Sequence, residues 1–190
     1  MGRRERFHLP EEADRYMFLF GVMSGALLLA SAAFFLVRVH DEVGAFGPPL
    51  DDSWIHYRFA RNLAEGYGFC FNKGEPIGGS TAPVWTLILA AAYMLTGEMM
   101  FTSFALGVFF VWLGGLAIYA LALLLTGSRP FAFAAGLLSL SLGRVTWGAL
   151  SGMEIGLAVF LTSFGLYLHF SEGGKAPLRR QLLTSAVFTL

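Results

Sequence analysis

The most constraining feature of this sequence is the apolar segment Met100 to Thr126, which is long enough to cross a bilayer as one helix. A helix needs roughly 20 mostly apolar residues for this. Residues 16–38, 131–147 and 155–170 are predicted as further spans, and another is expected to begin at 181–190. We therefore predict an all-α fold, a polytopic transmembrane helical bundle whose backbone groups are hydrogen-bonded within the helices.

The two ends of the sequence add to this prediction. Arginines precede a full-length apolar run at the N-terminus, which is typical of an uncleaved signal anchor. At the other end the sequence stops inside the last apolar segment, and half a span would leave backbone groups unsatisfied in lipid. We expect residues 1–190 to form an N-terminal transmembrane catalytic module of a longer protein.

The composition excludes two other classes of protein. Charged residues make up 14% of the chain, whereas a soluble domain carries about 25%. The formal net charge is zero, so the chain offers no bulk basic surface for nucleic acid. Cys70 is the only cysteine, which excludes an intrachain disulfide.

The placement of the basic residues predicts which loops share a side of the membrane. The segment Ala82 to Gly97 is apolar but short for a span. If it spanned, Arg129 and the basic loop Lys175 to Arg180 would lie outside, against the positive-inside rule. If it lies at the interface, all basic clusters lie inside. We therefore predict that residues 40–99 form one long outer loop and that 148–154 form a short outer turn.

The outer loop is predicted to contain a juxtamembrane amphipathic helix from Ser53 to Glu65. Ile55, Phe59 and Leu63 recur at helical spacing and form an expected apolar stripe. Such a helix next to a span would lie flat on the bilayer. Polar and aromatic side chains line another face of this helix: Trp54, Arg58, Arg61 and Glu65.

Two pairs of charged residues in the loop are candidates for catalysis and for ligand binding. Asp51 and Asp52 can provide a general base or hold a divalent cation. Arg58 and Arg61 can grip a phosphate. Together, at a membrane surface, these groups suit a sugar linked to a lipid phosphate. The residue types leave a second interpretation open, in which the arginines contact lipid headgroups and Asp51 caps the helix.

Two further residues are candidates for this outer face. His56 is interpreted as a loop histidine in preference to a metal ligand. Glu154 either is a polar turn residue or is a functional carboxylate that faces the same side as Asp51. The glycines between Gly74 and Gly79 do not form a phosphate-binding loop, because they lack a following Lys-Ser/Thr and a strand-to-helix setting.

The outer loop carries a recognisable series of motifs: DD, YRFARN, G-x-G, FN-x-GE and T-x-P-x-W. This series resembles the first outer loop of GT-C superfamily glycosyltransferases, above all the arabinofuranosyltransferase-like branch. Protein O-mannosyltransferases and lipid A aminoarabinose transferases share the coarser plan. The turn SGMEIGL is similar to the second outer-loop acidic motif of the same branch. The resemblance covers about Pro49 to Leu157.

The resemblance implies roles for individual residues. Asp51 matches the expected catalytic base, Asp52 matches an assisting or metal-binding neighbour, and Glu154 matches the second-loop acidic position. If a divalent cation takes part, these three carboxylates are its expected ligands. The expected substrate-binding residues are Arg58, Arg61, Lys73, His56 and Trp54, with the three basic side chains Arg58, Arg61 and Lys73 near the donor phosphate.

The resemblance also implies a reaction and a place. The expected activity is transfer of a sugar from a polyprenyl-phosphate donor to a hydroxyl of a cell-envelope glycan, lipid or protein. The enzyme would be a multi-pass protein of the bacterial cytoplasmic membrane, in contact with membrane lipids, with its active site on the periplasmic side. Two alternatives remain: a non-catalytic membrane subunit that binds lipid-linked glycan or a partner protein, and, more remotely, a transporter.

Overall fold

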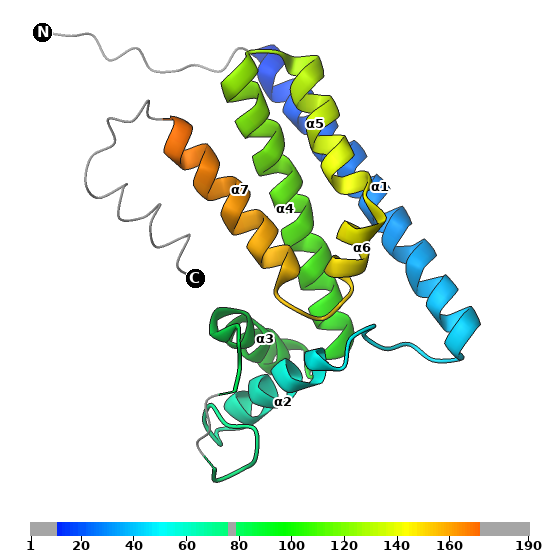
Figure 1. The fold of residues 1–190 in the computed structure, drawn as a ribbon, viewed down its shortest axis with the longest axis vertical. Helices are drawn as coiled ribbons and strands as arrows, with labels where there is room; N and C mark the ends of the chain where they lie inside the picture. Colours follow the sequence, from blue (N-terminus) through cyan, green and yellow to red (C-terminus); the bar gives the residue numbers. More distant parts are fainter. Residues whose placement is uncertain (1–10, 76–78, 172–190) are drawn as a thin grey trace, which may run out of the picture.

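The computed structural model describes residues 11–75 and 79–171 of the chain. This part of the chain is entirely helical, without strands, which confirms the predicted all-α class for these residues (Figure 1). The helices are α1 (Glu11–Val43), α2 (Asp52–Ala64), α3 (Pro83–Thr96), α4 (Met100–Thr126), α5 (Arg129–Ser141), α6 (Gly143–Ala149) and α7 (Ile155–Ser171). The segment 181–190, predicted to begin another span, lies outside the described residues.

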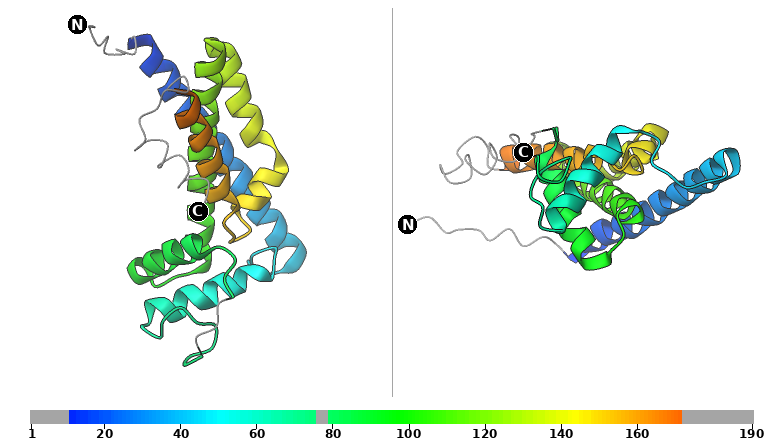
Figure 2. Two further views of the ribbon diagram at one scale, coloured as in Figure 1. Left: turned by 60° about the vertical axis from the view of Figure 1, so that its left-hand side comes forward. Right: turned by 90° about the horizontal axis from the view of Figure 1, so that it is seen from below.

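Helix α4 is the central element of a bundle with α1, α5, α6 and α7 packed around it. The long helices run roughly alongside one another, whereas α2 and α3 pair at one end of the bundle and lie across its axis (Figures 1 and 2). The α6–α7 turn reaches the same end as α2 and α3. The α4–α5 turn and the C-terminal end of α7 lie at the opposite end (Figure 1).

Two helices are long and apolar enough to cross a membrane by length and composition: the part of α1 from Arg15 to Val43, and α4. They contain the predicted spans 16–38 and 100–126. Helices α3 and α7 are apolar but shorter. α7 coincides closely with the predicted segment 155–170, and α3 lies across the bundle and not among its long helices (Figure 2).

Close helix packing in the bundle depends on glycine. A Cβ atom on Gly107 of α4 would lie 1.9 Å from the carbonyl oxygen of Ala149. A Cβ atom on Gly156 of α7 would lie 2.5 Å from the carbonyl oxygen of Gly107. Small residues of this kind let helix backbones approach closely. These two positions therefore fix how α6 and α7 sit against α4.

The predicted span 131–147 is not one continuous helix, because the helix is broken at Leu142. Leu142 has an extended backbone, with φ −75° and ψ 120°, between the end of α5 and the start of α6. The hydroxyls of Ser139 and Ser141 donate to carbonyls three and four residues earlier, at 2.7 Å each. Such back-bonding bends helices, and Gly143 adds backbone freedom at the break.

The predicted apolar stripe of α2 is only partly correct. Phe59 is buried, but Ile55 is exposed and Leu63 is half-buried. The buried face instead includes the polar residues Ser53, His56 and Asn62. Hydrogen-bond partners make this possible: for example, the Asn62 amide donates to the carbonyl oxygens of Cys70 and Phe71, both at 2.9 Å.

Trp85 of α3 corrects another expectation. It belongs to the segment Ala82 to Gly97, which is predicted to lie at the membrane interface, but its side chain is completely buried within the protein. Its indole Nε1 donates to the carbonyl oxygen of Gly152, at 3.0 Å, in the α6–α7 turn. Ser53 of α2 also donates a hydrogen bond to this turn, to the carbonyl oxygen of Ser151. The pair of α2 and α3 is therefore fastened to the bundle through the α6–α7 turn.

Candidate functional site

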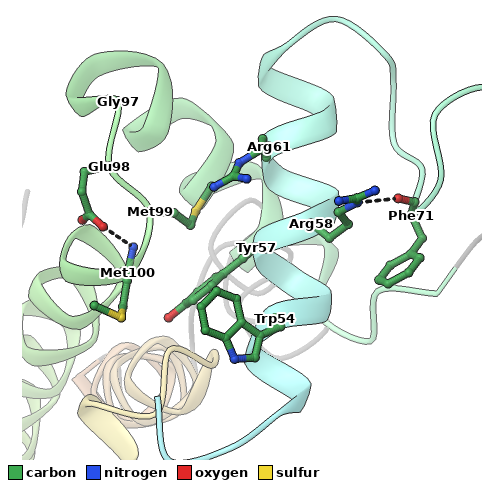
Figure 3. A pocket seen from close by; sticks show the side chains of 9 residues that line it. All are labelled: Trp54, Tyr57, Arg58, Arg61, Phe71, Gly97, Glu98, Met99 and Met100. Atoms are coloured by element: carbon green, nitrogen blue, oxygen red, sulfur yellow. Dashed lines mark hydrogen bonds between the residues drawn. The ribbon is translucent and has the colours of Figure 1, made fainter. Parts of the chain in front are cut away.

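A pocket of about 700 Å³ lies between α2 and the connection from α3 to α4 (Figure 3). Its walls contain three of the predicted substrate-binding residues and several apolar side chains. The lining residues are Trp54, Tyr57, Arg58, Arg61, Phe71, Gly97, Glu98, Met99 and Met100. The pocket is thus amphiphilic, with two guanidinium groups set among aromatic and thioether side chains.

Arg58 and Arg61 both line this pocket, and neither has a carboxylate partner among the described residues. The Arg58 Nε donates to the carbonyl oxygen of Phe71 at 3.1 Å, and Figure 3 shows its side chain pointing that way. Arg61 extends toward Met99, and its guanidinium carbon lies 5.7 Å from the centre of the Tyr93 ring. Within the described residues, neither arginine forms an ion pair with a carboxylate. An anionic group in the pocket would therefore meet two available cations.

Glu98, on the opposite wall, does not supply the missing counter-charge. Its carboxylate accepts hydrogen bonds from the backbone N–H groups of Met100 at 2.9 Å, Phe101 at 2.8 Å and Thr102 at 3.2 Å. These N–H groups, in the first turn of α4, have no carbonyl partner within the helix. A negative charge at this end is favourable because it interacts with the helix dipole. Glu98 is thus committed to capping α4.

Asp51 extends the pocket-facing stripe of α2. Asp51, Trp54, Arg58 and Arg61 follow one another at spacings of three and four residues, which places them along one face of a helix. Asp51 has helical backbone angles, is exposed, and accepts a hydrogen bond at 3.0 Å from the backbone N–H of Asp52. At about 1.5 Å rise per residue, it lies roughly 10 Å along the axis from Arg58.

Asp52, the second residue of the acidic pair, lies near His56 and not on the pocket-facing stripe. Asp52 stands one helical turn before His56, whose pKa responds to its charge. The structure therefore divides the acidic pair, with Asp51 on the pocket stripe and Asp52 on the side of His56.

His56 joins α2, α3 and the α6–α7 turn in one polar network. Its Nε2 lies 3.6 Å from Oε2 of Glu154, and its Nδ1 lies 3.4 Å from the hydroxyls of both Thr86 and Ser80. The two hydroxyls hydrogen-bond each other at 2.7 Å. The interpretation of His56 as a loop histidine was wrong, because it is a buried helical residue. It does not line the pocket.

Burial lowers the pKa of His56, and the nearby charges of Glu154 and Asp52 oppose that effect without cancelling it. The imidazole is therefore neutral at pH 7, and its contact with Glu154 is not an ion pair at that pH. Oε2 of Glu154 is buried and has no hydrogen-bond partner within the described structure. His56 and Glu154 thus form a close, partly desolvated pair.

We expect the stability of the protein to fall as the pH drops below 6.5, the ordinary pKa of a histidine side chain. The unfolded chain takes up a proton on His56 at a higher pH than the folded chain does, so protonation favours unfolding between the two pKa values. The slope from this one group is at most about 1.4 kcal/mol per pH unit. Thermal unfolding from pH 8 to pH 5 measures it. The variant His56→Gln should reduce the dependence of stability on pH. If the pH dependence of this variant equals that of the wild type, His56 is not the titrating group. The matched control is His40→Gln, since His40 is exposed.

Lys73, the remaining predicted donor contact, is engaged outside the pocket. Its Nζ lies 3.0 Å from Oε2 of Glu65 and 3.8 Å from the centre of the Tyr67 ring. Its predicted role in donor binding stays a prediction. Trp54, in contrast, lines the pocket and packs edge-on against Tyr57, with ring centres 5.4 Å apart.

Sequence reasoning missed several residues that shape the site. Ser80 and Thr86 hold His56, and Trp85 and Ser53 hold the α6–α7 turn. Trp85 is the last residue of the T-x-P-x-W motif. The motif does not indicate its hydrogen-bond partner, the carbonyl oxygen of Gly152, which is 67 residues away in the sequence. Within the described ranges, no three His, Cys, Asp or Glu side chains are grouped so as to hold a metal ion, so Asp51, Asp52 and Glu154 do not form such a cluster.

Comparison of the chain with protein-family models, with curated proteins and with solved structures finds no match.

Proposed function

We propose that this protein is a membrane glycosyltransferase that moves a sugar from a polyprenyl-phosphate donor to an acceptor hydroxyl. The observation that carries the proposal is the amphiphilic pocket at the end of the bundle, which holds Arg58 and Arg61 among apolar side chains. A lipid-linked sugar phosphate needs such a combination: cations for the phosphate and an apolar wall for the isoprenoid. The motif resemblance to the GT-C superfamily supports the same activity.

In the proposed reaction, Arg58 and Arg61 bind the donor phosphate and stabilise the charge that develops on it as it leaves. The acceptor oxygen forms a bond to the anomeric carbon while the bond from that carbon to the phosphate oxygen breaks. The acceptor proton passes to the carboxylate of Asp51, and the leaving electron pair stays on the polyprenyl phosphate. The roughly 10 Å between Asp51 and Arg58 along α2 leaves room for a sugar ring between base and phosphate.

The proposed location is the bacterial cytoplasmic membrane, with several spans and with the pocket on the periplasmic side. Helices α1 and α4 are long and apolar enough to span. Arg129, at the start of α5, lies at the end of the bundle opposite α2 and α3 (Figure 1). The positive-inside rule then favours a cytoplasmic position for Arg129 and an outer position for the pocket. Participation of a divalent cation stays a prediction, which chelation during the transfer assay would test.

A non-catalytic role in binding lipid-linked glycan is the second candidate. One observation favours it: Glu154 contacts His56 and does not line the pocket, so two of the expected catalytic carboxylates, Asp51 and Glu154, occupy different surroundings. This candidate predicts donor binding without turnover.

Donor binding tests the shared part of both candidates. The full chain in nanodiscs is titrated with undecaprenyl phosphate, and binding is followed by native mass spectrometry. We expect Arg58→Gln and Arg61→Gln each to weaken binding about tenfold, because each removes a charge-assisted hydrogen bond. The control is Arg38→Gln, since Arg38 is an exposed arginine of α1 that pairs with Glu42 at 2.9 Å. Equal affinity for all variants would overturn the donor site.

Transfer separates the two candidates. Membranes containing the protein are incubated with radiolabelled polyprenyl-phosphate pentoses and hexoses, and label that moves to acceptor material is counted. Turnover that depends on Arg58 and Arg61 supports the transferase. Binding without any turnover over the whole donor panel supports the non-catalytic role.

A further inference from the structure

A groove of about 400 Å³ opens on the side of the bundle, away from the pocket, where the α5–α6 break faces α1. Phe34 and Phe35 of α1 line it, with Ser141, Gly143 and Thr146 from the region of the break. A second hollow of about 400 Å³, lined by Gly143, Arg144 and Trp147, adjoins it through the shared Gly143. The helix break at Leu142 interrupts the wall that a continuous helix would present here.

Arg144 stands beside this groove without a counter-charge. Its side chain is exposed, and within the described residues it forms no ion pair, hydrogen bond or ring contact. Its neighbours along the chain are apolar, and Leu138 and Leu142 are largely exposed. A charged side chain on an apolar, lipid-facing surface is costly unless it meets an anion or reaches the headgroup level.

The position of the groove along the bundle brings a lipid headgroup within reach. Its α1 residues, from Ala30 to Phe35, belong to the second half of that helix. Phe35 precedes the end of α1 at Val43 by a rise of roughly 12 Å. The groove thus faces the half of the bundle that carries α2 and α3, and a long arginine side chain can extend toward the bilayer surface on that side.

We propose that this groove binds an anionic phospholipid of the surrounding bilayer, with the lipid phosphate on Arg144 and an acyl chain against Phe34 and Phe35. The proposal requires that the chain lies in a membrane, and it does not require glycosyl transfer. Charge complementarity identifies the occupant: the guanidinium of Arg144, unpaired among the described residues, lies beside an apolar groove and matches one anionic headgroup on a hydrocarbon chain. Trp147 adds an amphipathic ring of the kind found at headgroup level.

This lipid site is separate from the proposed donor pocket. The two sets of lining residues have no member in common, and they lie on different elements: α1, α5 and α6 for the groove, and α2 with the α3–α4 connection for the pocket. A bound phospholipid would fill the gap at the helix break and brace α1 against α5 and α6. Substitutions at one site are therefore expected to leave the other site intact.

The experiment counts phosphatidylglycerol retained by the full chain. The protein is reconstituted in mixed phosphatidylglycerol and phosphatidylcholine, extracted in mild detergent, and examined by native mass spectrometry. We expect wild-type protein to retain one phosphatidylglycerol, Arg144→Gln to bind it about tenfold more weakly, and Arg144→Lys to keep part of the affinity. Ala30→Trp, which fills the groove from the exposed face of α1, should also lose the lipid.

Two controls make the outcome decisive. Arg15→Gln changes an exposed arginine near the opposite end of α1 and should retain the lipid, and circular dichroism checks that each variant is folded. Equal retention by Arg144→Gln and wild type would overturn the proposal, as would equal retention of phosphatidylcholine. Displacement of phosphatidylglycerol by undecaprenyl phosphate would assign the groove to the donor and overturn the proposal too. Failure of the transfer assay leaves this result unaffected.

Discussion

Replacing Asp51 with asparagine is expected to lower sugar transfer about 10²–10⁴-fold, the range that a positioned general base contributes. The substitution preserves the size of the side chain and its carbonyl oxygen, so the hydrogen bond from the backbone N–H of Asp52 is retained. Donor binding should remain near the wild-type level, because Arg58 and Arg61 are unchanged. The loss should therefore fall on kcat and not on KM.

The matched control for this prediction is Asp52→Asn. Asp52 stands on the His56 side of α2, away from the pocket stripe, and its loss should reduce transfer by much less. Radiolabel transfer by reconstituted protein, at saturating donor, measures both variants. Full activity of Asp51→Asn would remove Asp51 as the base. A larger loss for Asp52→Asn than for Asp51→Asn would show that the two carboxylates have been assigned to the wrong faces.

Gly107→Ala is expected to destabilise the bundle by roughly 3 kcal/mol or more, at the upper end of what overpacking costs. The added methyl carbon would lie 1.9 Å from the backbone carbonyl oxygen of Ala149, and a backbone atom cannot rotate away as a side chain does. Relief requires α4 to separate from α6. The same movement would disturb α7, since Gly156 packs against the backbone of Gly107.

Reversible unfolding of the purified protein in mixed micelles with increasing SDS, followed by circular dichroism, measures this change. Gly21→Ala in α1 is the matched control, because a Cβ atom there would meet only the side chains of Trp112 and Leu116 at 3.8 Å. This control should be neutral or slightly stabilising, since alanine favours helix over glycine by about 1 kcal/mol. Equal stability of Gly107→Ala and the wild type would mean that α4 and α6 are not in this close contact.

The sequence predicted best those features that depend on local pattern. The boundaries of α4 follow from an uninterrupted apolar run that ends at Gly127, where the backbone φ is 65°. The pocket stripe of α2 follows from helical spacing, which is why Trp54, Arg58 and Arg61 were found together. The break at Leu142 was missed because hydrophobicity alone does not register the back-bonding of Ser139 and Ser141.

Features that depend on contacts between distant segments could not be predicted. The approach of Glu154 to His56 joins the α6–α7 turn to α2, and no local periodicity encodes it. The buried polar face of α2 was misread for the same reason. Ser53 and Asn62 look like surface residues until their partners at Ser151 and Cys70 are known. Lys73 was placed near the donor by motif alone, whereas Glu65, one loop away, engages its ammonium group.

Because α2 is hydrogen-bonded to the α6–α7 turn, the shape of the pocket depends on the helical bundle as well as on the outer loop. Tyr57 lines the pocket, hydrogen-bonds Ser103 of α4, and packs so closely on Gly152 that a Cβ atom there would lie 2.2 Å from its hydroxyl. The position of Tyr57 in the pocket wall is therefore set by its contacts with the helical bundle. An excised peptide spanning residues 44–99 would keep Arg58 and Arg61 but lose the contacts with α4 and the α6–α7 turn that position α2. Changes in the α6–α7 turn should therefore alter the pocket even though none of its residues lines it.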